Sequence, residues 1–409
     1  MTYRRITWLT TPLFLLAANA QAALGWHGPE PFRLERLEGR SFDYNNESFL
    51  QRLSFTEQPL QGVRPLWQQN GWYGSGGSSR GKEFYVHSLL QQRLTFDAPV
   101  FLGVRHKRSE DLDGAYDRTL FGAGYQSEQH WDLGLWGEVN SAKEDMDLQL
   151  EANRYFADGS WVSGALVFTD VFYNNKTYSD NRYQRSPLTL YAAGSKLFSS
   201  QQLSGFINLN LQTRFANQEL QQLFSDEQYS AGISWQLLLG QNARFTVEGQ
   251  GLYGRRSAED LQQQSPDLAW QLHRRFQQLN AEWQWLSLKQ LPAVGVQANR
   301  LDEKDSRFAN TDRAAEYRRE AFAYVRLERS LTAGGVWRPT LYAGYAHVGS
   351  EFRQHSDEPL KDHGWLAKLS PNFIWSLSAQ TGAYVLINPT VKLHNLQFGG
   401  GNIQVYIPF

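Results

Sequence analysis

The feature of this sequence that most constrains its fold is an apolar–polar alternation of period two. In the last eight residues, Ile403, Val405, Ile407 and Phe409 lie on one side of the expected strand. The residues on the other side are Asn402, Gln404, Tyr406 and Pro408. The same alternation recurs in 131–139, 146–152, 229–237, 279–285, 321–328 and 383–393. Because successive side chains of a strand point to opposite faces, this pattern predicts strands rather than helices. No window of the chain after its N-terminus approaches the roughly 18 consecutive apolar residues of a membrane-spanning helix.

The composition suggests which way the apolar faces point. The chain of 409 residues contains 14 Trp, 19 Tyr and 24 Phe, yet its mean hydropathy is -0.53. Apolar faces turned to lipid and polar faces turned to a lumen would account for an aromatic-rich chain that is polar on average. A formal net charge of -1 argues against a nucleic-acid partner, because such proteins carry a strong basic field. The absence of cysteine excludes a disulfide framework and a thiolate metal site.

The N-terminus has the features of an export signal. Arg4 and Arg5 precede an apolar stretch at 6–18, and Ala20-Gln21-Ala22 is a small-x-small cleavage pattern. We therefore expect residues 1–22 to be a cleaved signal peptide. Residues 23–82 are expected to form a periplasmic tail or plug segment that could include a first strand, and 83–409 to form the barrel. The run Gly74 to Gly81 is interpreted as a flexible loop because of its Gly and Ser content.

Short and long breaks alternate between the expected strands. The short breaks are at 97–99, 127–130, 156–159, 199–202, 240–242, 289–292, 331–335 and 378–381. The longer polar ones are at 110–117, 141–145, 172–187, 215–226, 257–275, 301–314, 350–363 and 394–401. This rhythm is typical of a closed antiparallel transmembrane β-barrel with short periplasmic turns and longer extracellular loops. The breaks define 17 strands between Glu83 and Phe409. Because such barrels have an even number, we add Ser48 to Thr56 and predict about 18 strands, with 16 as the runner-up.

Together, the leader, the alternating strands, the loop rhythm and the terminal Ile403-Gln404-Val405-Tyr406-Ile407-Pro408-Phe409 resemble the Gram-negative outer-membrane β-barrel class. The resemblance implies a location in the outer membrane, among its lipid and lipopolysaccharide. It also implies insertion by the barrel-assembly machinery, which in this class reads a C-terminal strand ending in an aromatic residue. Ile403, Val405, Ile407 and Phe409 are then the assembly signal. Pro408 departs from the pattern, since it lacks a backbone donor beside the last residue.

Extending the alternation assigns a set of charged residues of both signs to the lumen. The pore-lining candidates are Arg93, Arg105, Asp132, Glu138, Asp147, Glu151, Arg244, Glu248, Glu282, Glu320, Arg326, Glu328, Lys368 and Lys392. Such a wall could hold water and set the selectivity of a pore, but opposite charges could equally pair and brace the barrel. Aromatic and amide side chains share this face, and together they can stack on and hydrogen-bond to sugars. Inward aromatics could also be simple filler.

The sequence offers little support for catalysis or metal binding. His347, His355, His363 and His394 lie in or near the last two outer loops, where polar residues are common. Glu110 to Gly114 lacks the spacing of a calcium loop. His87 and Ser88 are adjacent on a strand and must point to opposite faces, and Gly-x-Ser-x-Gly is absent. We therefore predict no catalytic residue, no metal and no cofactor.

Three functions remain open from the sequence. The first is a porin-like outer-membrane channel for small hydrophilic or sugar-like solutes. The alternative is a barrel for surface export or assembly, acting on a lipoprotein or an exopolysaccharide. The third is an outer-membrane hydrolase. An open conductance would favour the channel, whereas a silent barrel that copurifies with an exported substrate would favour the alternative.

Overall fold

The computed structural model describes residues 70–79, 83–111, 114–127, 131–138, 146–175, 180–262, 269–305, 314–331, 334–351, 363–378, 383–393 and 396–409. These residues form one sheet. Its strands are β1 (Gly71–Ser79), β2 (Glu83–Thr95), β3 (Val100–Asp111), β4 (Gly114–Gln126), β5 (Trp131–Gly137), β6 (Leu148–Tyr155), β7 (Trp161–Phe168), β8 (Arg182–Arg185), β9 (Leu188–Leu197), β10 (Gln201–Asn217), β11 (Gln222–Leu239), β12 (Ala243–Asp260), β13 (Trp270–Trp285), β14 (Ala293–Asp305), β15 (Ala314–Arg326), β16 (Arg329–Ser330), β17 (Gly335–Trp337), β18 (Thr340–Glu351), β19 (His363–Ser370), β20 (Phe373–Ser378), β21 (Ala383–Lys392) and β22 (Gln397–Pro408). A single 3-10 turn, Tyr173–Asn175, lies between β7 and β8. Within these residues, no helix is long and apolar enough to cross a membrane.

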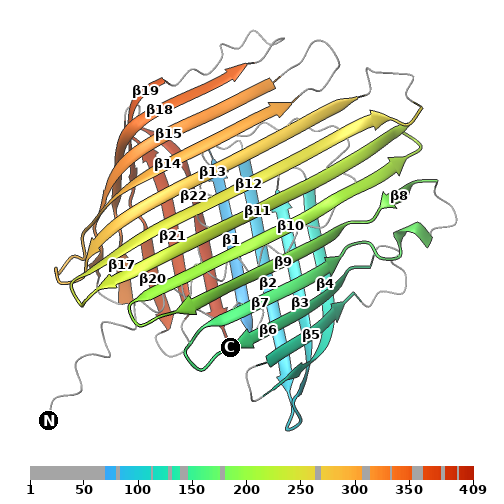
Figure 1. Cartoon of the computed structure of the whole chain (residues 1–409), viewed down its shortest axis with the longest axis horizontal. Helices are drawn as coiled ribbons and strands as arrows, with labels where there is room; N and C mark the ends of the chain where they lie inside the picture. The colour runs from blue at the N-terminus through green and yellow to red at the C-terminus, as the bar shows by residue number, and fades with distance from the viewer. Residues whose placement is uncertain are drawn as a thin grey trace.

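The sheet is a closed antiparallel barrel of 18 strands (Figure 1). β1 pairs with both β2 and β22, which closes the circuit. Four of the 18 strands are interrupted and carry two labels each. β8 and β9 both pair with β10, β15 continues into β16, β17 into β18, and β19 into β20. The predicted fold class and strand number are therefore confirmed.

The first strand is the main correction to the sequence interpretation. Gly74 to Ser79, expected to be a loop, belongs to β1, while Ser48 to Thr56 lies outside the described residues. Glycine weakens a strand, which is why the run resembles a loop in sequence. Here Gly74 lets the Trp72 indole lie against the backbone, since a Cβ at residue 74 would be 2.6 Å from that ring. The Asn70 side chain fixes the start of β1 by bonding the backbone N–H and C=O of Arg93.

The expected short turns match the gaps at one end of the barrel, but several expected outer loops are largely strand. β3 extends to Asp111 and β4 begins at Gly114; β10 extends to Asn217 and β11 begins at Gln222; β12 extends to Asp260 and β13 begins at Trp270. In sequence these polar extensions resemble loops, because few of their outward positions carry the apolar residues of a membrane strand. Contacts among buried Tyr183, Phe215, Phe224 and Ala258 stabilise the extended region.

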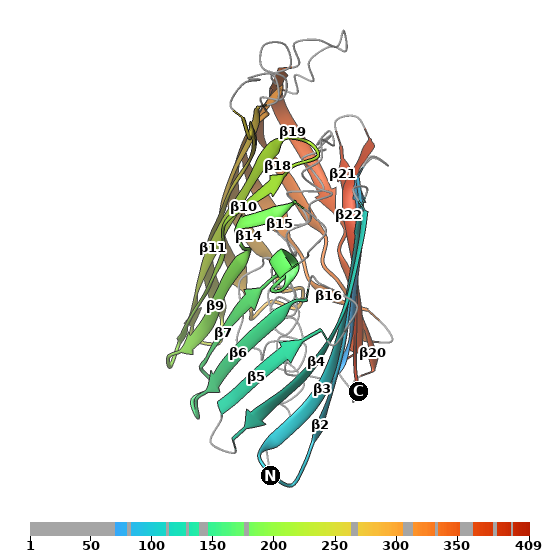
Figure 2. The same ribbon diagram turned by 90° about the vertical axis from the view of Figure 1, so that its right-hand side faces the viewer.

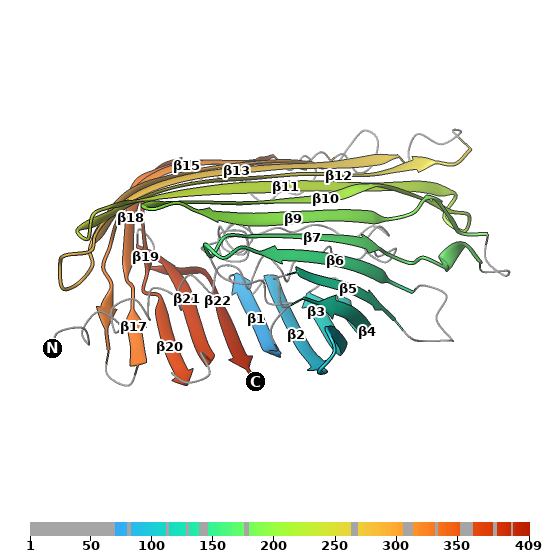
Figure 3. The same cartoon turned by 60° about the horizontal axis from the view of Figure 1, so that its bottom comes forward.

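The barrel is flattened into two walls (Figure 3). Strands β9 to β15 form one wall, and β20 to β22 with β1 to β4 form the other. The C-terminus lies at the end of the barrel that carries the short turns, as expected for a periplasmic end (Figure 2).

The two faces of the strands differ as the alternation predicts. Leu150 on β6 is 40% exposed, whereas its neighbour Glu151 is 4% exposed. Arg105 on β3 contacts Glu151 on β6 although β4 and β5 lie between them, and this is possible because the buried face is the concave one. The outer surface carries large exposed apolar side chains, including Leu135, Ile207, Ile233, Leu279 and Val296. The apolar face is therefore outside and the polar face inside.

The final strand has the predicted faces. Ile403 and Ile407 of β22 are exposed on the outer surface, while Gln404 and Tyr406 are buried inside. Pro408 does not disrupt the end of the ladder, because the Phe409 N–H donates to the Asn70 carbonyl at 3.2 Å.

Candidate functional site

The candidate site is the polar inner wall, and it contains the charged residues selected from the sequence. Eleven of them are buried: Arg93, Arg105, Asp132, Glu138, Asp147, Glu151, Glu282, Glu320, Glu328, Lys368 and Lys392. Arg244, Glu248 and Arg326 are half-buried. The structure groups most of these side chains into separate networks rather than one continuous line of charge.

The first network lies on the inner face of β2 to β6, beside one narrow edge of the flattened barrel (Figure 3). The Arg105 guanidinium donates to Glu151 at 2.6 Å and to Gln91 at 2.9 Å. Arg93 donates to Asp132 at 2.7 Å. Alternation places these residues on one face, but it could not show that β3 and β6 come into contact, because that depends on the curvature of the sheet.

Trp136 covers this network from the side. Its indole N–H donates to Glu151 at 3.0 Å, and the Arg105 guanidinium lies 4.1 Å from the ring centroid. Gly122 is required at this point, because a Cβ there would be 2.3 Å from the indole ring. The Trp136 ring can therefore lie flat on the wall, and it is fully buried. This network has the character of a structural brace.

A second network lies at the loop side of the same edge. Arg118 on β4 is 3.1 Å from Glu138 and 3.8 Å from both Asp147 and Asp170. Tyr183 donates to Asp170 at 2.6 Å. Glu138 follows the last residue of β5, and Asp147 precedes the first residue of β6. These two predicted pore-lining residues therefore lie at the loop-side ends of the strands.

A third network lies at the turn side of the other edge. Arg326 and Glu282 are paired at 2.6 Å, and Tyr324 donates to the same carboxylate at 3.1 Å. Arg338 and Glu328 are paired at 2.9 Å. The same side of the barrel holds Arg244, which donates to Gln284 at 2.5 Å, and Glu248, which lies opposite Asn280.

A row of amides crosses the long wall between these edges. Gln250 on β12 donates to Gln278 on β13 at 2.6 Å, and Gln278 donates to Asn299 on β14 at 3.0 Å. Asn299 donates to Glu320 on β15 at 3.3 Å, and Lys368 on β19 donates to Glu320 at 3.2 Å. We call these five residues, which are three amides that end at the Glu320–Lys368 pair, the amide row. Among the described residues, Oε1 of Gln250 has no hydrogen-bond partner and can accept from water or from a hydroxyl group.

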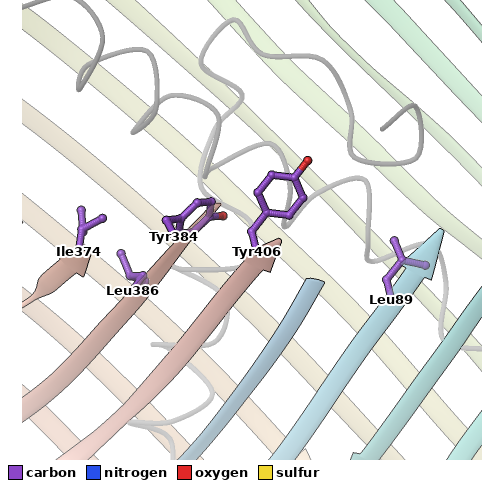
Figure 4. Packing of buried hydrophobic residues seen from close by; sticks show 5 residues of the cluster. All are labelled: Leu89, Ile374, Tyr384, Leu386 and Tyr406. Atoms are coloured by element: carbon purple, nitrogen blue, oxygen red, sulfur yellow. The ribbon is translucent and has the colours of Figure 1, made fainter. Parts of the chain in front are cut away.

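The opposite wall has an apolar patch on its inner face (Figure 4). Leu89, Ile374, Tyr384, Leu386 and Tyr406 project from β2, β20, β21 and β22. The rings of Tyr384 and Tyr406 are 5.7 Å apart. The inner wall thus combines aromatic and amide surfaces.

Several members of these networks were missed in the sequence. Arg118 and Asp170 adjoin expected loops, and Arg338 lies where β17 bends into β18. Arg118 shares a face with Leu120, which is buried inside. An apolar residue is expected outside, so no clear sequence signal marks Arg118. Among the described residues, no group of three His, Asp or Glu side chains is placed to hold a metal ion. His355 and His394 lie outside those residues. His87 and Ser88 are adjacent on β2, as expected.

The closed barrel, its apolar exterior and its polar interior define an outer-membrane β-barrel protein of the porin-like class. Solved barrels similar to this chain include OccAB3 of Acinetobacter baumannii, with 8% identity over 83% of this chain and 98% of that chain and a TM-score of 0.41. OmpT of Vibrio cholerae is 9% identical, with 83% and 96% covered and a TM-score of 0.34. A bacterial polysaccharide outer membrane secretin is 10% identical, with 83% and 97% covered and a TM-score of 0.37.

No protein-family model matches the sequence, and no curated protein matches it.

Proposed function

We propose that this protein is an outer-membrane channel that passes small hydrophilic, sugar-like solutes. The observation that carries the proposal is the amide row of the inner wall, within a closed barrel of 18 strands. Barrels of 16 to 18 strands are wide enough to leave an aqueous lumen. Amide groups that already bond one another in a row present further donors and acceptors to the hydroxyl groups of a solute.

The pairing of the inner charges favours neutral solutes over ions. Glu320 is paired with Lys368, Glu282 with Arg326 and Glu328 with Arg338. A paired wall has a smaller net field than the same charges would have alone, so it discriminates weakly between cations and anions. In this proposal the protein is exported by the leader Met1 to Ala22, and residues 23–82 form the segment that precedes most of the barrel.

Planar-bilayer recording tests the channel directly. Purified protein should give stepwise conductance, with a cation-to-anion permeability ratio close to that of free solution. Added oligosaccharides should enter the lumen and reduce the current. A barrel that never conducts, and that copurifies with a surface lipoprotein or polysaccharide, would replace the channel by the export alternative.

The paired charges give a second prediction about the channel. Neutralising Glu320 and Glu328 together leaves Lys368 and Arg338 without their carboxylates, so selectivity should shift toward anions. Replacing Arg326 leaves Glu282 without its guanidinium and should shift selectivity toward cations. A unit charge about 8 Å from an ion in water changes its energy by about 0.5 kcal/mol, with opposite signs for a cation and an anion, so the removal of one charge should change the permeability ratio by up to about fivefold. Both shifts should fade in high salt; an unchanged ratio would place these pairs away from the narrowest part of the lumen.

The terminal residue is expected to control assembly. We propose that the outward row of Ile403, Val405, Ile407 and Phe409 is recognised by the barrel-assembly machinery. Deleting Phe409 should slow the appearance of the heat-modifiable folded form and leave unassembled protein open to periplasmic proteases. Arg329→Gln, at the exposed residue 329 of the short β16, serves as a control that should assemble normally. Assembly of the truncated chain at the wild-type rate would contradict the proposed signal.

A further inference from the structure

The outer surface carries a basic residue at the same position on five neighbouring strands. Counting toward the loop side, the first acidic or basic outward residue is Arg255 on β12, Arg275 on β13, Arg300 on β14, Arg319 on β15 and His347 on β18. Below them the outward positions are mainly apolar, for example Leu279, Val296 and Leu341. By contrast, the outward residues at the loop-side ends of β5, β6 and β7 are Gly137, Leu148 and Phe168.

These five residues lie at one depth. When strands tilt by about 40° from the barrel axis, residues at the same depth on neighbouring strands are offset from the hydrogen-bonded register by about one residue. Arg255 is in register with His273, two residues from Arg275, and Arg275 is in register with Asp302, two residues from Arg300. Arg300 is in register with Arg319, and Arg319 with His347. From β12 to β14 the offset is toward the turn side, which is the direction that the tilt of these strands in Figure 1 requires. The five residues therefore lie at nearly the same depth in the membrane.

The charge balance of this surface is positive. Arg255, Arg275, Arg300, Lys304 and Arg319 face outward, and we call these five residues the basic belt. Asp302 lies between two of them, 2.6 Å from Arg300 and 3.9 Å from Arg319, and Glu227 is in register with Arg255. Glu259 also faces outward and is exposed, so five cations and three carboxylates give a local charge of +2, on a chain whose net charge is -1. Asp302 also orients the Arg300 and Arg319 side chains within the belt.

We propose that the basic belt binds the phosphate groups of a phosphorylated glycolipid in the outer leaflet, of the lipopolysaccharide class. The belt lies between the apolar outer surface and the extracellular loops. This is the depth at which the headgroups of the outer leaflet lie. Arg300 and Arg319 are directly opposite each other on adjacent strands, which lie about 5 Å apart, and guanidinium groups suit bidentate contacts with phosphate oxygens. The outward apolar residues beneath the belt, including Leu279 and Val296, would contact the acyl chains of the same molecule.

The test measures binding of bisphosphorylated lipid A to the purified barrel in neutral phosphatidylcholine vesicles. The triple variant R275Q/R300Q/R319Q should bind at least about tenfold more weakly than wild type, because each basic residue near such a surface contributes about one kcal/mol. R154Q is the matched control. Arg154 faces outward on β6 at the turn side, 4.9 Å from the Trp131 ring centroid, and its replacement removes an exposed cation without touching the belt.

Three further arms identify the ligand. Dephosphorylated lipid A should bind wild type weakly, inorganic phosphate should fail to displace lipid A, and heat-modifiable migration should show that all variants are folded. Wild-type affinity in the triple variant would overturn the proposal. So would equal binding of dephosphorylated lipid A, displacement by millimolar phosphate, or a loss in R154Q as large as in the triple variant. None of these measurements depends on conductance, so the outcome is separate from that of the channel proposal.

Discussion

Replacing Glu151 by Gln is expected to reduce the free energy of unfolding by about 3 to 5 kcal/mol. The Glu151 carboxylate accepts from Arg105 at 2.6 Å and from the Trp136 indole at 3.0 Å, and it lies 3.8 Å from Arg93. All four side chains are buried. Removing the carboxylate that Arg105 contacts leaves a buried guanidinium without this counter-charge, and the cost of that desolvated charge far exceeds the value of the pair itself.

The measurement is equilibrium unfolding in urea of protein refolded into lipid vesicles, followed by tryptophan fluorescence and gel mobility. Asp158→Asn provides the control. Asp158 lies in the turn between β6 and β7, where its exposed carboxylate bonds Lys196 at 2.7 Å. That hydrogen bond lowers the pKa of Asp158 to about 2, so the group is ionised throughout the assay. Because the pair is exposed, its loss should change stability little.

A double variant separates the effect of the buried charge from the effect of the lost hydrogen bonds. Arg105→Met with Glu151→Leu removes both charges and fills the space with apolar atoms, which is often neutral for a buried pair. It should therefore recover much of the stability lost in Glu151→Gln. If the double variant were as unstable as the single one, the hydrogen bonds to Trp136 and Gln91 would be the main contribution, rather than the buried charge.

The sequence predicts the wall of this barrel well because a single rule governs it. Period two determines which side chains share a face, so Leu150 and Glu151 could be assigned to opposite faces without knowledge of the fold. The same rule, with the alternation of short and long breaks, predicts 17 strands, and the even number typical of such barrels adds the eighteenth. Its limits appear at the loop-side ends of β10 to β13, where the outward positions are mainly polar and Phe215, Phe224 and Ala258 are buried inside.

The position of the first strand could not be predicted for a different reason. β1 has the sequence Gly-Trp-Tyr-Gly-Ser-Gly-Gly-Ser-Ser, which contains no β-branched residue and, after Trp72 and Tyr73, only Gly and Ser. Its strand conformation is stabilised by backbone pairing with β2 on one side and β22 on the other. Long-range pairing of this kind depends on barrel closure, which the local sequence does not encode.

The partners of the inner charges are unpredictable for a similar reason. Register and curvature bring Arg105 to Glu151 across two intervening strands, and they bring Lys368 on β19 to Glu320 on β15. The sequence predicts that these residues face inward, but the choice between free pore charges and paired braces required the structure. The pairs in the structure are the basis for expecting weak ion selectivity.

Leu150→Arg is expected to destabilise the membrane-inserted barrel by about 2 to 4 kcal/mol. Leu150 faces outward on β6, four residues toward the loop side from Arg154, where an arginine would have to enter the hydrocarbon. The same face already carries Arg154, but that guanidinium lies near the turn side, within 4.9 Å of the Trp131 and Phe156 ring centroids. Ala152→Arg, halfway between the two, should cost less than Leu150→Arg because the cost falls toward the interface.

Bilayer thickness distinguishes this effect from that of the adjacent Glu151. In a thinner bilayer an arginine at 150 can reach the headgroups with its long side chain, so the loss caused by Leu150→Arg should shrink. The loss caused by Glu151→Gln should stay the same, because its origin is inside the barrel wall. Unfolding titrations of both variants in vesicles of short-chain and long-chain phosphatidylcholine measure the difference. If the cost of Leu150→Arg were independent of thickness, then residue 150 would not face lipid, and the assignment of the outer face would be wrong.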